Sequence, residues 1–177
     1  MLPVFLFILK TLWKRVSPSP QDMEKTTVEA LLYVPGSKES GPKVWCAMGS
    51  GFVVVTDATE WEYETHMRHA KDRVSCLLAV GKNQVWAGSL DTTIYVINTQ
   101  TGKADQQLLG HRDSISHMTK TVDSQGNTTV WSASSDGQIV GWDPVTLTTK
   151  KEVRRAHCSV MFSDSPNGPT VLPAWSV

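Results

Sequence analysis

The chain has 177 residues, 40% of them hydrophobic, and its 17 Lys and Arg residues balance 17 Asp and Glu residues. This length suits one packed domain with a tail, and the neutral charge argues against nucleic acid or an acidic membrane as a partner of the whole surface. The cysteines Cys46, Cys76 and Cys158 lie far apart without a CxxC pair. They argue against a disulfide framework or a zinc site, and fit a reducing cytoplasm.

Residues 1–25 combine an apolar run, MLPVFLFIL, with the linker Ser17-Pro18-Ser19-Pro20. A membrane-spanning helix needs about 20 apolar residues, so this run is too short. In a signal peptide the basic residues precede the apolar run, whereas here they follow it. We therefore expect a short helix or linker that docks on a neighbouring surface. A peripheral membrane contact and a targeting signal are the alternatives.

After Pro20, short β-branched and aromatic runs alternate with clusters of Gly, Asp, Asn and Ser. This pattern is typical of an all-β domain with many short strands. The expected strands fall into three groups of four: 26–34, 43–48, 52–57 and 61–67; 74–80, 84–89, 93–98 and 104–109; 115–121, 128–133, 138–143 and 148–153. The Asp136-Gly137 pair between two of them is a strong hairpin signal.

The three groups repeat one another. A Val-Trp pair ends at Trp45, Trp86 and Trp131, which lie 41 and 45 residues apart. Twelve residues after these tryptophans come Asp57, Asn98 and Asp143, respectively. A repeat of about 40–45 residues holds four strands and is the length of one β-propeller blade. The spacing therefore predicts blades at 26–67, 74–109 and 115–153, within a repeat region 26–157.

The third group, with Gly110-His111, the turn Ser132-Ala133-Ser134-Ser135-Asp136-Gly137 and Trp142-Asp143, resembles a WD repeat. The second group matches less fully. The first is degenerate, with Ser50 where the other two have aspartate and Thr56 where the third has Trp142. The stretch is similar to the C-terminal WD-repeat region of DENN domain-containing Rab exchange factors. That resemblance implies an incomplete WD-repeat propeller, while the exchange module of such factors lies far upstream and is not carried over to this chain.

In WD repeats a histidine, a serine or threonine, an aspartate and a tryptophan form a hydrogen-bonded set. Matched by position, the third blade supplies His111, Ser132 or Ser134, Asp136 and Trp142. Asp136 is expected to accept from one ring nitrogen of His111. The second blade supplies His69 and Asp91, with Ala87 and Ile97 at the serine and tryptophan positions. Such a buried network stabilises a fold when every member is satisfied.

Three chemical alternatives are weaker. A Ser-His-Asp set suggests a hydrolase, but no G-x-S-x-G elbow is present and the residues recur at blade positions. Gly49-Ser50-Gly51 lacks the third glycine and the helix of a dinucleotide site. His66 and His69 have no third metal ligand nearby. We predict no catalytic residue, cofactor or metal.

Loops that join one blade to the next should lie on one face of the propeller. The stretches 66–73, 110–113 and 150–157 carry more positive than negative charge. The positive residues are Arg68, Lys71, Arg73, Arg112, Lys150, Lys151, Arg154 and Arg155, against Asp72, Asp113 and Glu152. An acidic or phosphorylated protein segment is the predicted partner class, and ordinary solvated loops are the alternative.

Three blades cannot close a ring, and the proline-rich tail 158–177 does not continue the repeat. We expect the tail to be irregular and the chain to be a fragment or short isoform of a longer factor. Open blade faces should be covered by self-association or by another chain. The predicted function is a non-catalytic protein-protein interaction module. The alternative is a regulatory isoform that competes for the partners of the propeller and so modulates Rab exchange and membrane trafficking.

Overall fold

The described part of the chain is entirely β-structure. The computed structural model describes residues 27–36, 41–60 and 63–153, with the backbone only at 63–67. In chain order the strands are β1 (Val28–Val34), β2 (Lys43–Met48), β3 (Phe52–Asp57), β4 (Tyr63–Arg68), β5 (Val74–Val80), β6 (Gln84–Ser89), β7 (Ile94–Asn98), β8 (Ala104–Leu108), β9 (Ile115–Val122), β10 (Thr128–Ser134), β11 (Ile139–Trp142) and β12 (Thr149–Val153). The predicted segments 1–25 and 158–177 lie outside the described residues.

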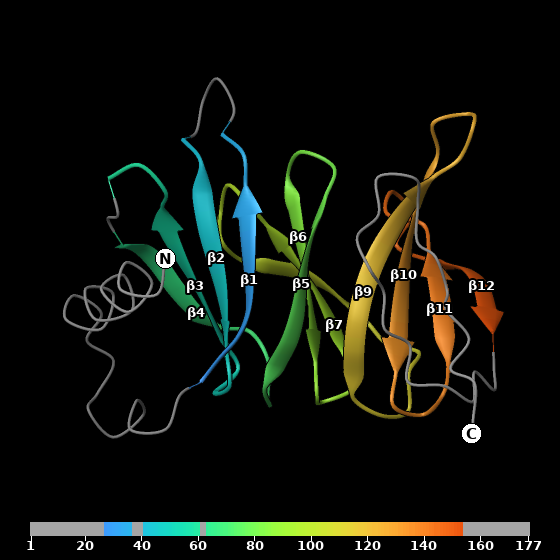
Figure 1. The fold of residues 1–177 in the computed structure, drawn as a ribbon. Coiled ribbons are helices and arrows are strands. Elements are labelled where there is room, and N and C mark those ends of the chain that lie inside the picture. The colour runs from blue at the N-terminus through green and yellow to red at the C-terminus, as the bar shows by residue number, and fades with distance from the viewer. Residues whose placement is uncertain (1–26, 37–40, 61–62, 154–177) are drawn as a thin grey trace, which may run out of the picture.

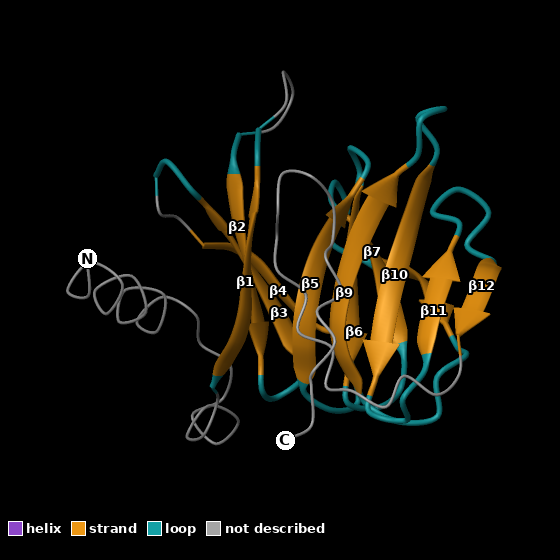
Figure 2. Ribbon diagram, turned by 45° about the vertical axis from the view of Figure 1, so that its right-hand side comes forward, coloured by secondary structure: helices purple, strands orange, loops and turns teal. Residues whose placement is uncertain are grey.

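The strands form three separate sheets of four antiparallel neighbours, paired in chain order as β1 to β4, β5 to β8 and β9 to β12. The sheets stand side by side, with the first strands adjacent, β1 beside β5 and β5 beside β9 (Figure 1). The view turned by 45° shows the same serial order without any helix in the described residues (Figure 2). The predicted all-β blade architecture is confirmed, and each predicted strand end lies within two residues of the observed one. Within the described residues the three sheets do not close into a ring.

Connections between strands lie at two opposite edges of this arc (Figure 1). The lower rim comprises the turn 49–51, the loops 69–73 and 109–114, and the turns 90–93 and 135–138. The upper rim comprises the turns 58–60, 81–83, 99–103, 123–127 and 143–148.

The repeated position twelve residues after each Val-Trp tryptophan begins an upper-rim turn. Asp57 Oδ1 accepts hydrogen bonds from two backbone N–H groups, of Thr59 at 2.7 Å and Glu60 at 2.8 Å. Asn98 and Asp143 make the same pair of bonds in their own blades. A short polar side chain that accepts from the backbone two residues ahead fixes a tight turn. The regular recurrence of these residues is therefore explained by turn geometry.

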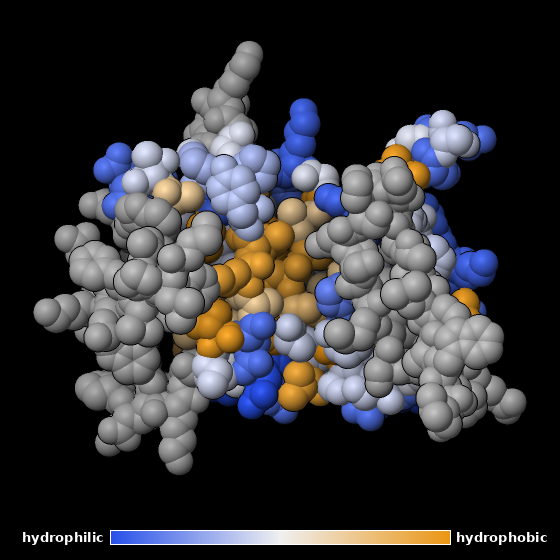
Figure 3. Space-filling view, in the orientation of Figure 1, coloured by the Kyte–Doolittle hydropathy of each residue, from blue (hydrophilic) through white to orange (hydrophobic). Residues whose placement is uncertain are grey.

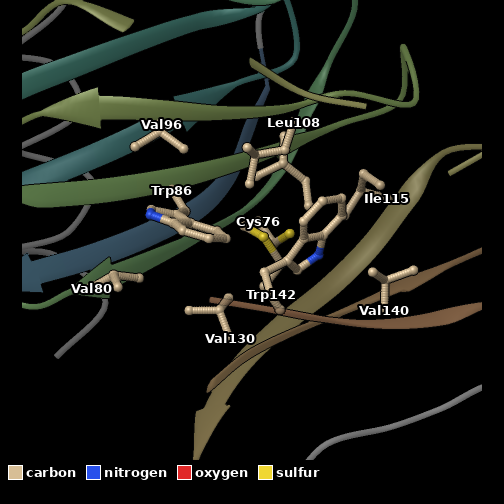
Figure 4. Close-up of a cluster of buried hydrophobic side chains, with 11 residues drawn as sticks. Cys76, Val80, Trp86, Val96, Leu108, Ile115, Val130, Val140 and Trp142 are labelled. Carbon is tan, nitrogen blue, oxygen red and sulfur yellow. The ribbon is translucent and has the colours of Figure 1, made fainter. Parts of the chain in front are cut away.

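Two apolar clusters fill the spaces between sheets. One joins the first and second blades around Trp45, and the other joins the second and third around Trp86 (Figure 4). Both of these tryptophan side chains are buried. Trp131 holds the equivalent position in the third blade, but no further sheet from the described residues lies against it, and its side chain is only half-buried. Each Val-Trp tryptophan therefore belongs to the blade face that meets the following blade.

Candidate functional site

The third blade contains a buried polar chain that reaches from the lower rim to the middle of the sheet. The indole Nε1–H of Trp142 donates to Ser132 Oγ at 2.8 Å, and Ser132 Oγ lies 2.7 Å from His111 Nε2. Ser132 is fully buried, while Ser134 instead donates to the backbone oxygen of Asp113 at 2.9 Å. Of the two serines considered from the sequence, Ser132 is the one that joins this hydrogen-bonded network.

Asp136 is not hydrogen-bonded to His111 as the sequence suggested. Its Oδ1 lies 4.0 Å from His111 Nδ1, and this nitrogen is buried without a hydrogen-bond partner. The carboxylate accepts instead from the backbone N–H groups of Arg112 and Gln138, both at 2.8 Å. Asp136 therefore links the loop 109–114 to the turn 135–138. Its interaction with the imidazole is electrostatic, without a hydrogen bond.

Burial is the main influence on the His111 ring. It lowers the pKa of His111 below the usual value, while the charges of Asp136 and Glu152 act in the opposite direction. The neutral ring is thus favoured in the fold. When Ser132 donates its hydroxyl hydrogen to Nε2, the ring proton sits on Nδ1, on the side of Asp136. The edge of the imidazole also meets the Trp142 ring, with the ring centroids 6.5 Å apart.

The second blade uses a related carboxylate in a different network. Asp91 accepts from the backbone N–H of Lys71 at 2.9 Å and of Thr93 at 3.1 Å, and from the Tyr95 hydroxyl at 2.7 Å. Burial opposes ionisation of Asp91, yet these bonds outweigh it and lower the pKa of the carboxyl. Burial and the Asp91 charge together raise the pKa of Tyr95 to about 12. Sequence reasoning missed Tyr95, which faces Asp91 because of its register in β7.

The predicted pairing of His69 with Asp91 is wrong. In both blades the residue that donates its backbone N–H to the aspartate follows the histidine position directly, and in the second blade this donor is Lys71. The residue before it is Ala70, which is buried, so Ala70 and not His69 holds the place of His111. No hydrogen bond joins His69 to Asp91 within the described residues. Burial alone lowers the pKa of His69.

The positive residues predicted to share one face are divided between the two rims. Arg68 at the end of β4, Lys71, Arg73 and Arg112 belong to the lower rim and are exposed. Lys150 and Lys151 lie within β12, not in a loop between blades. Lys150 Nζ contacts Asp143 at 3.1 Å and donates to the Thr128 carbonyl at 3.3 Å, beside the upper rim. Arg154 and Arg155 lie outside the described residues.

The lower rim also carries more negative charge than the loop sequences indicated. The turns 90–93 and 135–138 bring Asp91 and Asp136 to the same edge as Asp72 and Asp113. Four described cations therefore face four carboxylates, and the predicted positive excess is absent from the described part of this rim. Asp72 and Asp113 are exposed, and each accepts one local backbone hydrogen bond on one oxygen, from the Arg73 N–H and the Ser114 N–H, respectively.

This geometry does not suit nucleophilic catalysis. Ser132 Oγ is buried and already accepts from Trp142, and the aspartate is too far from the imidazole to orient it by a hydrogen bond. Among the described residues no group of three His, Cys, Asp or Glu side chains could hold a metal ion. The described residues also contain no helix that is long and apolar enough to span a membrane.

Solved structures share this arrangement of blades. The chain matches a chain of the mitotic checkpoint complex crystal structure with a TM-score of 0.66 and 19% identity, over 82% of this chain and 43% of the other. It matches the WD40 β-propeller domain of Doa1 with a TM-score of 0.60 and 16% identity, over 73% and 41% of the two chains. The fold is that of WD-repeat β-propeller blades.

The sequence comparison identifies a relative among curated proteins. The chain is 32% identical to DENN domain-containing protein 3 of Mus musculus over 146 residues. These residues are 78% of this chain and 11% of the relative, so the chain spans about a tenth of the length of the curated protein that it matches. The predicted resemblance to a DENN domain-containing protein is confirmed. No protein-family model matches the chain.

Proposed function

We propose that this WD-repeat chain is a non-catalytic protein-protein interaction module, related to the WD-repeat region of DENN-type Rab exchange factors. The main support is the construction of the lower rim. Asp91 and Asp136 each bind two backbone N–H groups and so anchor the loops 69–73 and 109–114 to the blades. Rigid loops lose little entropy when a partner binds, which favours recognition.

The lower rim offers a partner the side chains of Arg68, Lys71, Arg73 and Arg112. Their charges extend from exposed positions, whereas Asp91 and Asp136 use both carboxylate oxygens in backbone hydrogen bonds. Arg73 lies 3.4 Å from Glu29, so part of its charge is already balanced. We propose an acidic or phosphorylated protein segment as the partner. It would meet Lys71 and Arg112 first, since guanidinium and ammonium groups bind carboxylate and phosphate oxygens.

A paired capture experiment tests this proposal. The full chain is immobilised as wild type, as Lys71→Glu with Arg112→Glu, and as the control Lys103→Glu, an exposed lysine of the upper rim. Proteins retained by wild type and control but lost from the double variant would then be purified and titrated directly, with and without phosphatase treatment. Equal retention by all three forms would refute the lower rim as the binding surface.

A second candidate function follows from the similarity to DENN domain-containing protein 3 over 78% of the chain. The chain would compete for the partners of a full-length relative in the cytoplasm or on endomembranes, and so modulate Rab exchange in membrane trafficking. Excess chain added to a cell extract should then change the rate of Rab nucleotide exchange by that relative. An unchanged exchange rate would refute the regulatory role. If partner capture is retained in the same sample, the proposal of an interaction module still holds.

The blade faces at the two ends of the arc support self-association or contact with another chain. Leu31 and Tyr33 on β1 are 46% and 60% exposed, and Val153 on β12 is 41% exposed. Trp131 lies on the third-blade face that corresponds to the covered Trp86 face. Sedimentation velocity of wild type and Trp131→Glu tests self-association through this face. A monomer at all concentrations for both forms would refute self-association.

A further inference from the structure

A groove on the upper rim lies between the second and third blades, at the opposite edge from the lower-rim loops. Its volume is about 460 Å³, within the range of roughly 300–1,000 Å³ typical of ligand sites. Three turns and the start of β12 line it: Val80, Gly81, Lys82, Asn83, Gln84, Gly126, Asn127, Thr128, Asp143, Pro144, Val145 and Lys150. Hydrophilic side chains gather along this edge, above an apolar centre over β1 and β5 (Figure 3).

Two turns with a glycine in the left-handed region border the groove. Gly81 and Gly126 have φ values of 61° and 83°, in the left-handed region that glycine adopts most readily. A Cβ atom built on either would meet no atom within 4 Å. Val80, at the end of β5, is buried in the cluster between the second and third blades. The groove therefore stands directly on the packed interface of the two blades.

The carboxylates at the groove already make most of their hydrogen bonds within the fold. Asp143 Oδ1 accepts from two backbone N–H groups, and its Oδ2 contacts Lys150 at 3.1 Å. Asp123, in the neighbouring turn, accepts from the backbone N–H groups of Gln125 and Asn127 and from the Asn127 side-chain amide. These bonds lower the pKa of both carboxyls and keep them ionised but occupied.

The hydrogen-bond donors of the groove remain largely unused. Lys82 and Asn83 are exposed, and no hydrogen bond from either side chain is formed within the described residues. Gln84 Oε1 accepts from Trp86 Nε1 at 3.0 Å, which leaves its amide N–H groups pointing away from that bond. Lys150 uses two of its three N–H groups, on Asp143 and on the Thr128 carbonyl. Among the described residues the groove thus offers the unpaired ammonium group of Lys82, with amide donors beside it, while its own carboxylate is already bonded.

One wall of the groove is apolar and exposed. Val145 is 88% exposed, the largest exposure among the large hydrophobic residues of the described chain, and Pro144 precedes it. The turn that carries them is held by the two backbone bonds to Asp143. A ligand with an apolar group beside an acceptor group would bury this valine while it satisfies the donors.

We propose that this groove binds a short extended protein segment in which an acidic side chain adjoins an apolar one. The acidic carboxylate binds Lys82 and the amide N–H groups of Asn83 and Gln84. The apolar side chain packs on Pro144 and Val145. This second site deepens the proposed interaction function and uses a surface on the opposite edge from Lys71 and Arg112.

The test is a titration of the ¹⁵N-labelled full chain with a defined peptide, acetyl-Ser-Gly-Glu-Leu-Ser-Gly-amide. Amide resonances of Gly81, Lys82 and Gly126 should shift. Lys82→Glu should weaken binding by up to about fivefold, because it removes an exposed ion pair with the peptide carboxylate. Val145→Asp should weaken it similarly. The matched control Lys103→Glu, in the adjacent upper-rim turn, should bind like wild type.

Three further arms can overturn the proposal. Equal binding of a peptide with Gln in place of Glu would refute recognition of the carboxylate. Equal shifts with sodium acetate would show that the groove binds a free carboxylate and not a protein segment. Shifts confined to the lower rim would place the peptide on the other proposed surface. The double variant Lys71→Glu with Arg112→Glu could lose partner capture while it still binds the peptide at the groove. That result would show that the groove binds independently of the lower rim.

Discussion

Replacing Ser132 by alanine removes the centre of the buried polar chain in the third blade. Ser132 Oγ is both the acceptor for Trp142 Nε1 and the neighbour of His111 Nε2, at 2.8 and 2.7 Å. Alanine fits such a position without strain, since Ala87 stands there in the second blade, where Ile97 holds the place of Trp142. The variant therefore deletes polar partners with little change of shape.

The expected cost follows from the atoms left without partners. Each buried polar group that loses its hydrogen bond costs about 1–3 kcal/mol, so two such groups cost about 2–6 kcal/mol. This is a large share of the roughly 5–15 kcal/mol that stabilises an ordinary domain. In a Trp142→Phe background only the imidazole is left unpaired, and Ser132→Ala should then cost about 1–2 kcal/mol less than in wild type.

Urea unfolding of the four forms, followed by tryptophan fluorescence and by circular dichroism, measures this coupling. Ser116→Ala is the control, because its exposed serine donates a single bond to the Ala133 carbonyl at 3.1 Å; it should cost no more than about 1 kcal/mol. The reasoning fails if Ser132→Ala is no more destabilising than Ser116→Ala. It also fails if the Ser132 and Trp142 variants are additive within about 0.3 kcal/mol.

Three further predictions concern stability and thiol reactivity. Gly51→Ala should cost at least about 2 kcal/mol more than Gly81→Ala in urea unfolding, because both have positive φ but only at Gly51 would a Cβ lie 2.5 Å from a backbone oxygen; equal costs would contradict this. Burial lowers the folded-state pKa of His111, so its neutral form stabilises the fold fully above about pH 6.5, and this contribution is lost as pH falls through the folded-state pKa. His111→Gln should therefore flatten the pH dependence of the unfolding free energy in this window. An unchanged slope would argue against this contribution. Burial raises the pKa of Cys46 and Cys76 to about 11, so in a Cys158→Ser variant both thiols should react with a disulfide reagent only as fast as the chain opens, whereas immediate labelling in native buffer would contradict their burial.

The blades could be predicted from the sequence because two independent features repeat with them. The Val-Trp pairs mark the second strand of each sheet, and the residues at 57, 98 and 143 begin a turn whose geometry needs a short polar acceptor. Both features depend on local backbone structure, so their spacing transfers directly to the fold.

The histidine positions could not be transferred in the same way. The blades are 41 residues apart at the donors Lys71 and Arg112, but 45 residues apart at Asp91 and Asp136, because the second and third blades differ in length between these points. Counting repeat lengths cannot detect a histidine that lies one residue away from its expected place. Only the hydrogen bonds from the backbone to the aspartates show that Ala70 holds the position of His111.

Charge on a rim of a propeller cannot be counted from the loops between blades alone. In each blade the turn between the second and third strands returns to the same edge, and here it brings Asp91 and Asp136 beside the cations of the loops 69–73 and 109–114. Lys150, counted with those loops by its position in the chain, lies instead at the opposite edge against Asp143. On both rims a carboxylate is already bonded to two backbone N–H groups, Asp136 on the lower rim and Asp143 on the upper. The exposed lysines Lys71 and Lys82 beside them are therefore the charges more available to a ligand.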